Sequence, residues 1–242
     1  MTWTQPSSFQ AKLFVGDKFA CSGTLITRRH ILTAAHCPSV VGSVVLLGGL
    51  GRRIGLPLLA SSMTLHPQYN SSTSASDVAV VQLERDITDS EFIDHQLSLA
   101  RLNRWPWSPG AGAPAMLTGW GFTSEFPGGT PTETLQIAHV NVLTTDECNK
   151  IHQSAPGGFV IDWQQDLCAW AYQRRSCWGD SGGPLWQVTP GSDPITFTQF
   201  AIVSSAMGSP ARPCDAKWPT VFMRTSYYWG WIESVTGGGL AS

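Results

Sequence analysis

With 242 residues the chain can form one large all-β domain or two small ones, and either can bury a sizeable core. Only 13% of the residues are charged and the formal net charge is −2, which excludes partners held by charge alone, such as nucleic acid or an anionic membrane surface. The 24 glycines and 16 prolines favour short strands and tight turns over long helices.

The first ten residues have neither the basic start nor the apolar core of a signal peptide. Either a leader was removed before this start and Met1 was added for expression, or the protein stays inside the cell. The uncharged segment 31–51 is long enough for a transmembrane helix, but His36, Cys37, Pro38 and several glycines interrupt it. We therefore expect no membrane span.

The cysteines are even in number, and no two have the C-x-x-C spacing of a zinc site or a redox pair. Unrelated buried thiols are one interpretation. Three disulfides, in any of about fifteen pairings, are the other, and they suit an oxidised secreted domain. We favour disulfides and expect an oxidising compartment, extracellular or periplasmic. The six cysteines are Cys21, Cys37, Cys148, Cys168, Cys177 and Cys214.

The first third of the chain reads as short β-rich runs separated by Gly, Ser, Arg or Pro. The predicted strands are residues 10–15, 20–26, 40–47 and 57–65.

Two polar residues stand out beside these runs. His36 lies in the sequence ILTAAHC, where a lone histidine among alanines is ordinarily structural. Asp77 opens the apolar strand 77–83, DVAVVQL, and burying its carboxylate is costly unless a donor meets it. Asp77 therefore either caps the strand end or orients an imidazole.

Residues 101–112, RLNRWPWSPGAG, are rich in proline and glycine and have no strand period. We interpret them as the crossing between two halves, residues 1–107 and residues 108–242. A second set of strands follows, which completes the inventory for two six-stranded antiparallel barrels. These strands are predicted at 115–120, 133–143, 158–161, 184–188, 196–203 and 219–225.

Only the end of the chain looks helical. Tyr228, Trp231, Ile232 and Val235 recur at i, i+3, i+4 and i+7. Ser226 is the predicted N-cap, and a glycine at position 237 is the predicted stop.

Ser181 lies between glycines in the sequence SCWGDSGGPL, residues 176–185. A tight turn is the simplest interpretation. The glycines also allow two backbone N–H groups to face the oxyanion of a tetrahedral intermediate. A bare G-x-S-x-G matches the nucleophile elbow of α/β-hydrolases as well, but that fold needs a histidine after the serine, and every histidine precedes Ser181.

His36, Asp77 and Ser181 share one explanation. Serine is a poor nucleophile at neutral pH and needs a base such as an imidazole to take its proton. A buried carboxylate then fixes the imidazole tautomer and stabilises its cationic form. Because the three residues are far apart in sequence, only a fold that brings two halves face to face can assemble them.

From about residue 9 to residue 232 the sequence resembles the chymotrypsin-like (trypsin-like) serine proteases. The motifs occur in the family's order, and together they are specific. They are CSGTLI at 21–26, TAAHC at 33–37, DVAVVQL at 77–83, TGWG at 118–121, GDSGGPL at 179–185 and IVS at 202–204.

The resemblance implies an all-β fold of two packed six-stranded barrels with a C-terminal helix and the active site in the cleft. It implies a serine endopeptidase without metal or cofactor, in which the first barrel supplies His36 and Asp77 and the second supplies Ser181. The N–H groups of Gly179 and Ser181 would form the oxyanion hole, and Ser204 would hydrogen-bond the aspartate. The implied disulfides are Cys21–Cys37, Cys148–Cys168 and Cys177–Cys214.

The chain departs from the family at its start. Members usually begin with Ile-Val-Gly-Gly, whose freed ammonium group pairs with the aspartate that matches Asp180, whereas this sequence begins with Met-Thr-Trp-Thr. Phe19 stands where many family zymogens have a histidine that holds this aspartate. An unpaired buried carboxylate is expensive. Our hypothesis is that an internal basic residue replaces the ammonium; the alternative is that Asp180 faces solvent.

The substrate pocket is a second departure. Arg175 matches the base of the family's specificity pocket, Ala206 and Thr220 match wall positions that are often glycine, and Trp178 and Ser204 complete the predicted substrate-binding set. A guanidinium there would pair with an acidic substrate side chain. The alternative is that Arg175 turns out to solvent and leaves a pocket for small residues.

The sequence offers no metal site. Residues 38–65, where some relatives bind calcium, contain no Asp or Glu. Asn70 begins a glycosylation sequon, Asn-Ser-Ser, on a predicted surface loop. The histidines without a carboxylate or cysteine at ligand spacing are expected to be structural or solvated, namely His30, His95, His139 and His152.

Two classes of function fit these observations. The first is a secreted, monomeric serine endopeptidase that acts on protein or peptide substrates and accepts a protein inhibitor in its cleft. The second is a catalytically silent relative that binds a partner through the same cleft. The complete set of His36, Asp77 and Ser181 favours the enzyme.

Overall fold

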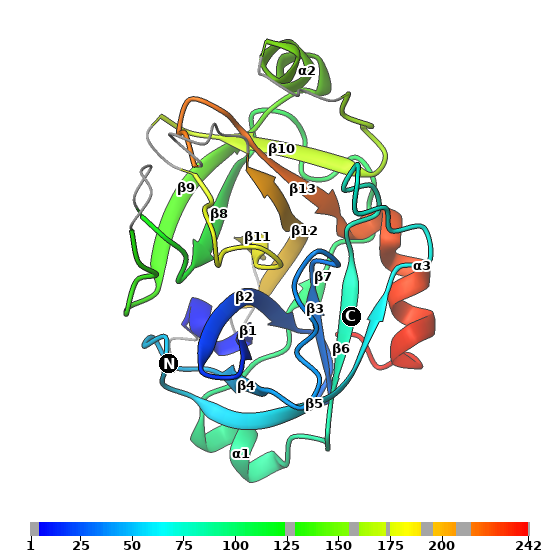
Figure 1. Ribbon diagram of the computed structural model, residues 1–242. Coiled ribbons are helices and arrows are strands. Elements are labelled where there is room, and N and C mark those ends of the chain that lie inside the picture. Colours follow the sequence, from blue (N-terminus) through cyan, green and yellow to red (C-terminus); the bar gives the residue numbers. More distant parts are fainter. Residues whose placement is uncertain are drawn as a thin grey trace.

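The computed structural model describes residues 5–123, 129–154, 160–172, 175–189, 196–206 and 214–241. Two β-barrels dominate it, with the first barrel below the second in the view of Figure 1 and the C-terminal helix alongside both. The fold class predicted from the sequence is therefore confirmed.

The first barrel is closed and entirely antiparallel, with strand order β1-β2-β3-β6-β5-β4. Alternating residues such as Ala11, Leu13 and Val45 fill its core. The strands are β1 (Gln10–Val15), β2 (Lys18–Leu25), β3 (His30–Thr33), β4 (Val44–Leu47), β5 (Leu56–Leu65) and β6 (Ala79–Leu83).

The second barrel closes by the pairing of β11 with β12, in the order β11-β8-β9-β10-β13-β12. A short strand from the crossing segment, β7 (Arg101–Leu102), adds to β12 in parallel. The strands are β8 (Pro114–Gly119), β9 (Gln136–Val142), β10 (Asp166–Trp170), β11 (Pro184–Val188), β12 (Phe197–Ala206) and β13 (Thr220–Arg224).

Helices lie at the edges of the barrels. None of them, within the described ranges, is long and apolar enough to cross a membrane. The C-terminal helix buries Tyr228 and Ile232 in an apolar cluster that both barrels share, with Val78 from the first and Ile202 from the second. The helices are η1 (Pro6–Phe9), α1 (Asp89–Asp94), α2 (Thr145–Gln153) and α3 (Thr225–Thr236).

The prediction of a single helix was wrong. Helices α1 and α2 each begin with a capping box, in which a threonine and the glutamate three residues later bond each other's backbone N–H. These pairs, Thr88 with Glu91 and Thr144 with Glu147, were the sequence signal. The predicted N-cap of α3 was also wrong, because the helix starts before Ser226, whereas Gly237 ends it in a left-handed conformation as predicted.

Two strand predictions also need correction. β3 was not predicted, because its residues were interpreted only as the approach to His36. In the predicted strand 158–161, residues 158 and 159 lie outside the described residues and 160–161 are not in a strand. The strand in this region is β10, and it begins only at Asp166.

Every cysteine of the chain is in a disulfide. The three pairs are those that the resemblance implied, Cys21–Cys37, Cys148–Cys168 and Cys177–Cys214. The first ties β2 to the residue after His36.

The turn that carries Ser181 packs directly on the first barrel. The Ser22 amide of β2 donates to the Ser181 carbonyl at 2.9 Å, and the Ser22 hydroxyl donates to the Gly179 carbonyl at 2.8 Å. Gly182 has φ +79°, and a Cβ added to it would lie 2.1 Å from Thr33 Oγ1 and 2.4 Å from the Ser22 carbonyl. Only glycine therefore allows this contact between the barrels.

We predict that Gly182→Ala lowers the free energy of unfolding by more than about 3 kcal/mol, because the methyl group overlaps the backbone of the first barrel. The matched control is Gly42→Ala. Gly42 has a similar φ of +76° but nothing within 4 Å of an added Cβ, so only the conformational cost of about 1 kcal/mol applies. Urea unfolding measures both, and equal losses would contradict the proposed overlap.

Candidate active site

Asp77 and His36 form a two-point contact in the first barrel. The Asp77 side chain is fully buried just before β6, and the His36 ring is 34% exposed just after β3. Asp77 Oδ2 lies 2.7 Å from His36 Nδ1, and Asp77 Oδ1 accepts the His36 backbone N–H at 2.7 Å. This geometry fixes the direction of the imidazole.

A third donor reaches Asp77 from the second barrel. Ser204 Oγ donates to Asp77 Oδ2 at 2.6 Å. Three donors offset the cost of burying the carboxylate. Because the carboxylate only accepts, the proton of the neutral imidazole is on Nδ1, which leaves Nε2 free to accept one.

His36 and Ser181 border the same cavity, whose volume is about 380 Å³. The structure thus brings together His36, Asp77 and Ser181, which are far apart in the sequence. Beyond His36 and Ser181, the described residues that line the cavity are Ser74, Ser176, Cys177, Trp178, Val203, Ser204, Ser205 and Cys214.

Two backbone N–H groups at the Ser181 turn have no acceptor among the described residues. Those of Asp180, Gly182 and Gly183 donate to carbonyls, whereas those of Gly179 and Ser181 make no hydrogen bond within the described part of the chain. Gly179 has φ +93°, and an added Cβ would lie 2.7 Å from the Phe19 ring. The glycine is therefore required, and its N–H is available to an anionic oxygen.

Asp180 points into the protein rather than into solvent. Its carboxylate accepts the N–H of Gly121 at 2.8 Å and that of Cys177 at 3.0 Å. Burial raises the pKa of Asp180 to about 6, against the two amide donors, which lower it. Among the described residues no basic side chain lies within ion-pair distance of this carboxylate. Neither a paired basic residue nor a solvent-facing Asp180, the two outcomes considered from the sequence, is observed here.

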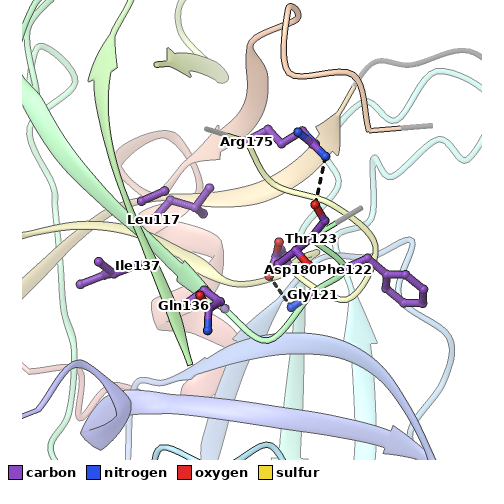
Figure 2. Close-up of a pocket in the computed structure, with 10 residues that line it drawn as sticks. Leu117, Gly121, Phe122, Thr123, Gln136, Ile137, Arg175 and Asp180 are labelled. Carbon is purple, nitrogen blue, oxygen red and sulfur yellow. Dashed lines mark hydrogen bonds between the residues drawn. The ribbon is translucent and has the colours of Figure 1, made fainter. Parts of the chain in front are cut away.

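Arg175 lines a different cavity from the one that holds Ser181. This second cavity, of about 200 Å³, also contains Asp180 and Gln136. Figure 2 shows Arg175 extended toward Thr123, whose carbonyl accepts from its guanidinium at 3.4 Å. The structure therefore does not place Arg175 at the base of the substrate pocket, because the guanidinium finds an acceptor and partial solvent exposure on the other side.

The remaining predicted pocket residues are distributed differently. Trp178 borders the cavity of Ser181 and is 52% exposed. Thr220 is buried behind Ser176, and their hydroxyl oxygens are 2.9 Å apart. The side chain of Ala206 is outside the described part of the structure. Ser22, which holds the backbone of Gly179 and Ser181, was not singled out from the sequence, although it lies within the motif CSGTLI.

Two clusters combine a histidine with two cysteines, but in both the sulfur atoms are joined in a disulfide and are not thiolate ligands. Over the described ranges no other group of His, Cys, Asp and Glu could hold a metal ion. The clusters are Cys21, His36 and Cys37, and Cys148, His152 and Cys168.

Comparisons with known proteins identify the family of this chain. A family model described as Trypsin matches residues 3–232. The chain is 30% identical over 234 residues to brachyurin from Leptuca pugilator, and the match covers 94% of this chain and 92% of that protein. It is 34% identical over 224 residues to a chymotrypsin from Phaedon cochleariae, covering 89% and 72%. Two further relatives are longer proteins, of which the chain covers only 13% and 20%.

Among solved structures, neuropsin, a serine protease expressed in the limbic system of mouse brain, superimposes with a TM-score of 0.77. The match covers 96% of this chain and 95% of neuropsin at 24% identity. At that identity the likeness supports the fold alone.

We predict a pH-dependent stability difference between the wild type and Asp180→Asn. A carboxyl whose pKa is raised to about 6 on folding stabilises the fold below about pH 4, and this contribution disappears as the pH rises through 6. Between pH 4 and pH 7 the wild type should therefore lose up to about 3 kcal/mol relative to the variant.

Urea unfolding with intact disulfides measures this difference. Asp166 is the control, because burial also raises its pKa to about 6 and Asp166→Asn should show the same trend. A wild type and Asp180→Asn that differ by the same amount at both pH values would contradict the prediction.

Proposed function

The chain belongs to the trypsin family and is a serine endopeptidase, and from this premise we propose that Ser181, His36 and Asp77 carry out the reaction. The observation that carries the proposal is the shared cavity of His36 and Ser181, with Asp77 bonded to the far side of the imidazole. The second candidate, a silent binding module, has no observation in its favour.

In the first half of the proposed reaction, His36 Nε2 takes the proton of Ser181 Oγ as that oxygen attacks the scissile carbonyl carbon. The resulting imidazolium donates through Nδ1 to Asp77. The protonated ring then gives its proton to the leaving amine, and the acyl group stays on Ser181. Water repeats these steps and releases the acid.

We propose that the N–H groups of Gly179 and Ser181 bind the negative oxygen of the tetrahedral intermediate. Neither N–H has a hydrogen-bond partner among the described residues, which supports this assignment. Backbone donors fixed by the surrounding structure need little reorganisation during the reaction, and one such donor is worth about 3 kcal/mol of transition-state stabilisation.

We propose that the enzyme prefers uncharged residues, such as the small ones expected from the sequence, before the scissile bond. Apart from the ionisable imidazole of His36, the described residues around the cavity have uncharged side chains. The Ser176 and Thr220 hydroxyls hydrogen-bond to each other, so neither needs a polar group of the substrate as a partner. A charged substrate side chain would be buried there without a partner, which is costly.

We further propose that the protein acts outside the reducing cytosol, as a monomer, on protein substrates and with a cleft open to protein inhibitors. The three disulfides support the oxidising compartment.

The proposed nucleophile is tested with a fluorophosphonate. We expect the folded protein to take up one equivalent, because Ser181 Oγ displaces fluoride from phosphorus, and we expect Ser181→Ala to take up none. Asp77→Asn should slow labelling by about 10⁴-fold, since the imidazole loses its orienting carboxylate. Ser234→Ala, an exposed serine of α3, is the control and should label at the wild-type rate. A folded wild type that is not labelled would favour the binding module.

The substrate preference is tested with chromogenic peptides that differ only in the residue before the scissile bond. We expect kcat/KM for Ala and Val to exceed that for Glu and Lys by about 100-fold, because the charged residues lose hydration without gaining a partner. Arg175→Ala should leave this order unchanged. A preference for Glu that Arg175→Ala removes would show that Arg175 turns into the pocket during binding, and a preference for Lys would contradict both alternatives.

A further inference from the structure

Lys12 of strand β1 is completely buried, although lysine is among the residues least often found inside proteins. Its neighbours Ala11 and Leu13 belong to the core cluster of the first barrel. Because side chains alternate along a strand, Lys12 points the other way, out of this core. The charge is therefore located between the barrels.

The Lys12 ammonium group is surrounded by main-chain carbonyls of one loop. Nζ donates to the carbonyls of Gly48 at 2.5 Å and Ile54 at 2.6 Å, and it lies 3.4 and 3.3 Å from those of Gly49 and Gly51. Burial lowers the pKa of Lys12 to about 7, while carbonyl acceptors favour the charged form. We call residues 48–54 the carbonyl loop.

The carbonyl loop depends on glycine for its shape. Gly48 and Gly49 have φ values of +72° and +73°, and Gly55, directly after the loop, has φ +148°. A Cβ on Gly55 would lie 2.4 Å from the Leu47 carbonyl. The chain is thus folded back on itself so that its carbonyls converge on one cation.

Trp120 of the second barrel rests on this arrangement. The Lys12 Nζ is 4.6 Å from the centre of the Trp120 ring, and Trp120 Nε1 donates to the Leu50 carbonyl of the carbonyl loop at 2.8 Å. The indole is fully buried. A cation over the ring face and an acceptor at its N–H together fix the position of this side chain.

The two neighbours of Trp120 hold Asp180. Gly121 N–H donates to the Asp180 carboxylate at 2.8 Å. A Cβ on Gly119 would lie 2.0 Å from Asp180 Oδ1, and one on Gly121 would lie 2.5 Å from the carboxyl carbon. The backbone around Trp120 therefore sets where Asp180 lies, and Asp180 separates Gly179 from Ser181.

We propose that Lys12 is a positioning residue for the reaction at Ser181. Its ammonium group orders the carbonyl loop and Trp120, and through Gly121 and Asp180 it holds the N–H groups of Gly179 and Ser181 in place. This inference rests on the proposed function, because its readout is the reactivity of Ser181.

The charged groups on the surrounding elements have partners other than Lys12. Arg52 of the carbonyl loop pairs with Glu133, in the second half of the chain. Asp180 is held by backbone amides. Within the described part of the chain, no carboxylate lies at ion-pair distance from Lys12.

The test is Lys12→Met, which keeps an unbranched side chain one atom shorter and removes the charge. We expect fluorophosphonate labelling and kcat to fall 10- to 100-fold with KM changed less than about 2-fold, because misplaced oxyanion donors affect the transition state more than substrate binding. Lys18→Met, an exposed lysine on β2, is the control and should behave as the wild type.

A double-variant cycle tests the route. Trp120→Phe removes the hydrogen bond to Leu50, and we expect the double variant Lys12→Met/Trp120→Phe to be no more than about 3-fold slower than the slower single variant. If the rate reduction of the double variant equals the product of the two single reductions, Lys12 and Trp120 act independently, and this result would overturn the proposal. So would a folded Lys12→Met that labels at the wild-type rate.

If Lys12→Met does not fold, Lys12→Arg replaces it. The guanidinium keeps its charge at every pH used, so the labelling rate of the wild type should fall between pH 7 and pH 9 relative to Lys12→Arg, as Lys12 loses its proton. Parallel profiles would overturn the proposal. A wild type that is never labelled would instead refute the proposed function itself.

Discussion

The turn that carries Ser181 is bound to the backbone of β2, and the geometry of the site depends on this contact. Ser22 holds the carbonyls of both Ser181 and Gly179. The residue before it, Cys21, is joined to Cys37, which follows His36. Two consecutive residues of β2 thus fix both the proposed nucleophile and the proposed base. Ser181 belongs to the second barrel and His36 to the first. The hydrogen bonds of Ser22 and the disulfide of Cys21 leave little freedom for either group to move.

Three buried ionic groups surround this contact, and each is stabilised mainly by backbone or hydroxyl groups. Asp77 accepts from a hydroxyl and an amide as well as from the imidazole. Asp180 accepts from two amides, and Lys12 donates to carbonyls. The barrels hold these backbone dipoles in fixed positions. The dipoles therefore stabilise a buried charge more rigidly than a flexible charged side chain would. Burial raises the pKa of Asp180 to about 6, which indicates that the two amides solvate its charge incompletely.

The sequence predicted the elements that have a local signal. Apolar alternation identified most strands. The glycine at position 237 identified the end of α3, where the structure has it in a left-handed conformation. Ordered motifs predicted that His36, Asp77 and Ser181 belong to one site. No local signal predicted where the Arg175 side chain points. Its orientation depends on the Thr123 carbonyl, which is 52 residues away in the sequence and comes close only in the folded chain. Lys12 was missed for the same reason, since its acceptors lie more than thirty residues away and only the closed barrel delivers them.

Polar contacts alone do not hold the two barrels together. The Ser204 to Asp77 hydrogen bond crosses between them, and a single bond of this kind contributes only about 1 to 3 kcal/mol. Directly behind it lies the apolar cluster in which Val78 and Ile202 meet Tyr228 and Ile232 of α3. Each fully buried side chain of this size contributes about 2 kcal/mol. The apolar cluster therefore adds to the free energy of docking, whereas the hydrogen bonds between the barrels select the one arrangement in which the imidazole borders the same cavity as Ser181. Helix α3 contributes to the site in this way without touching it.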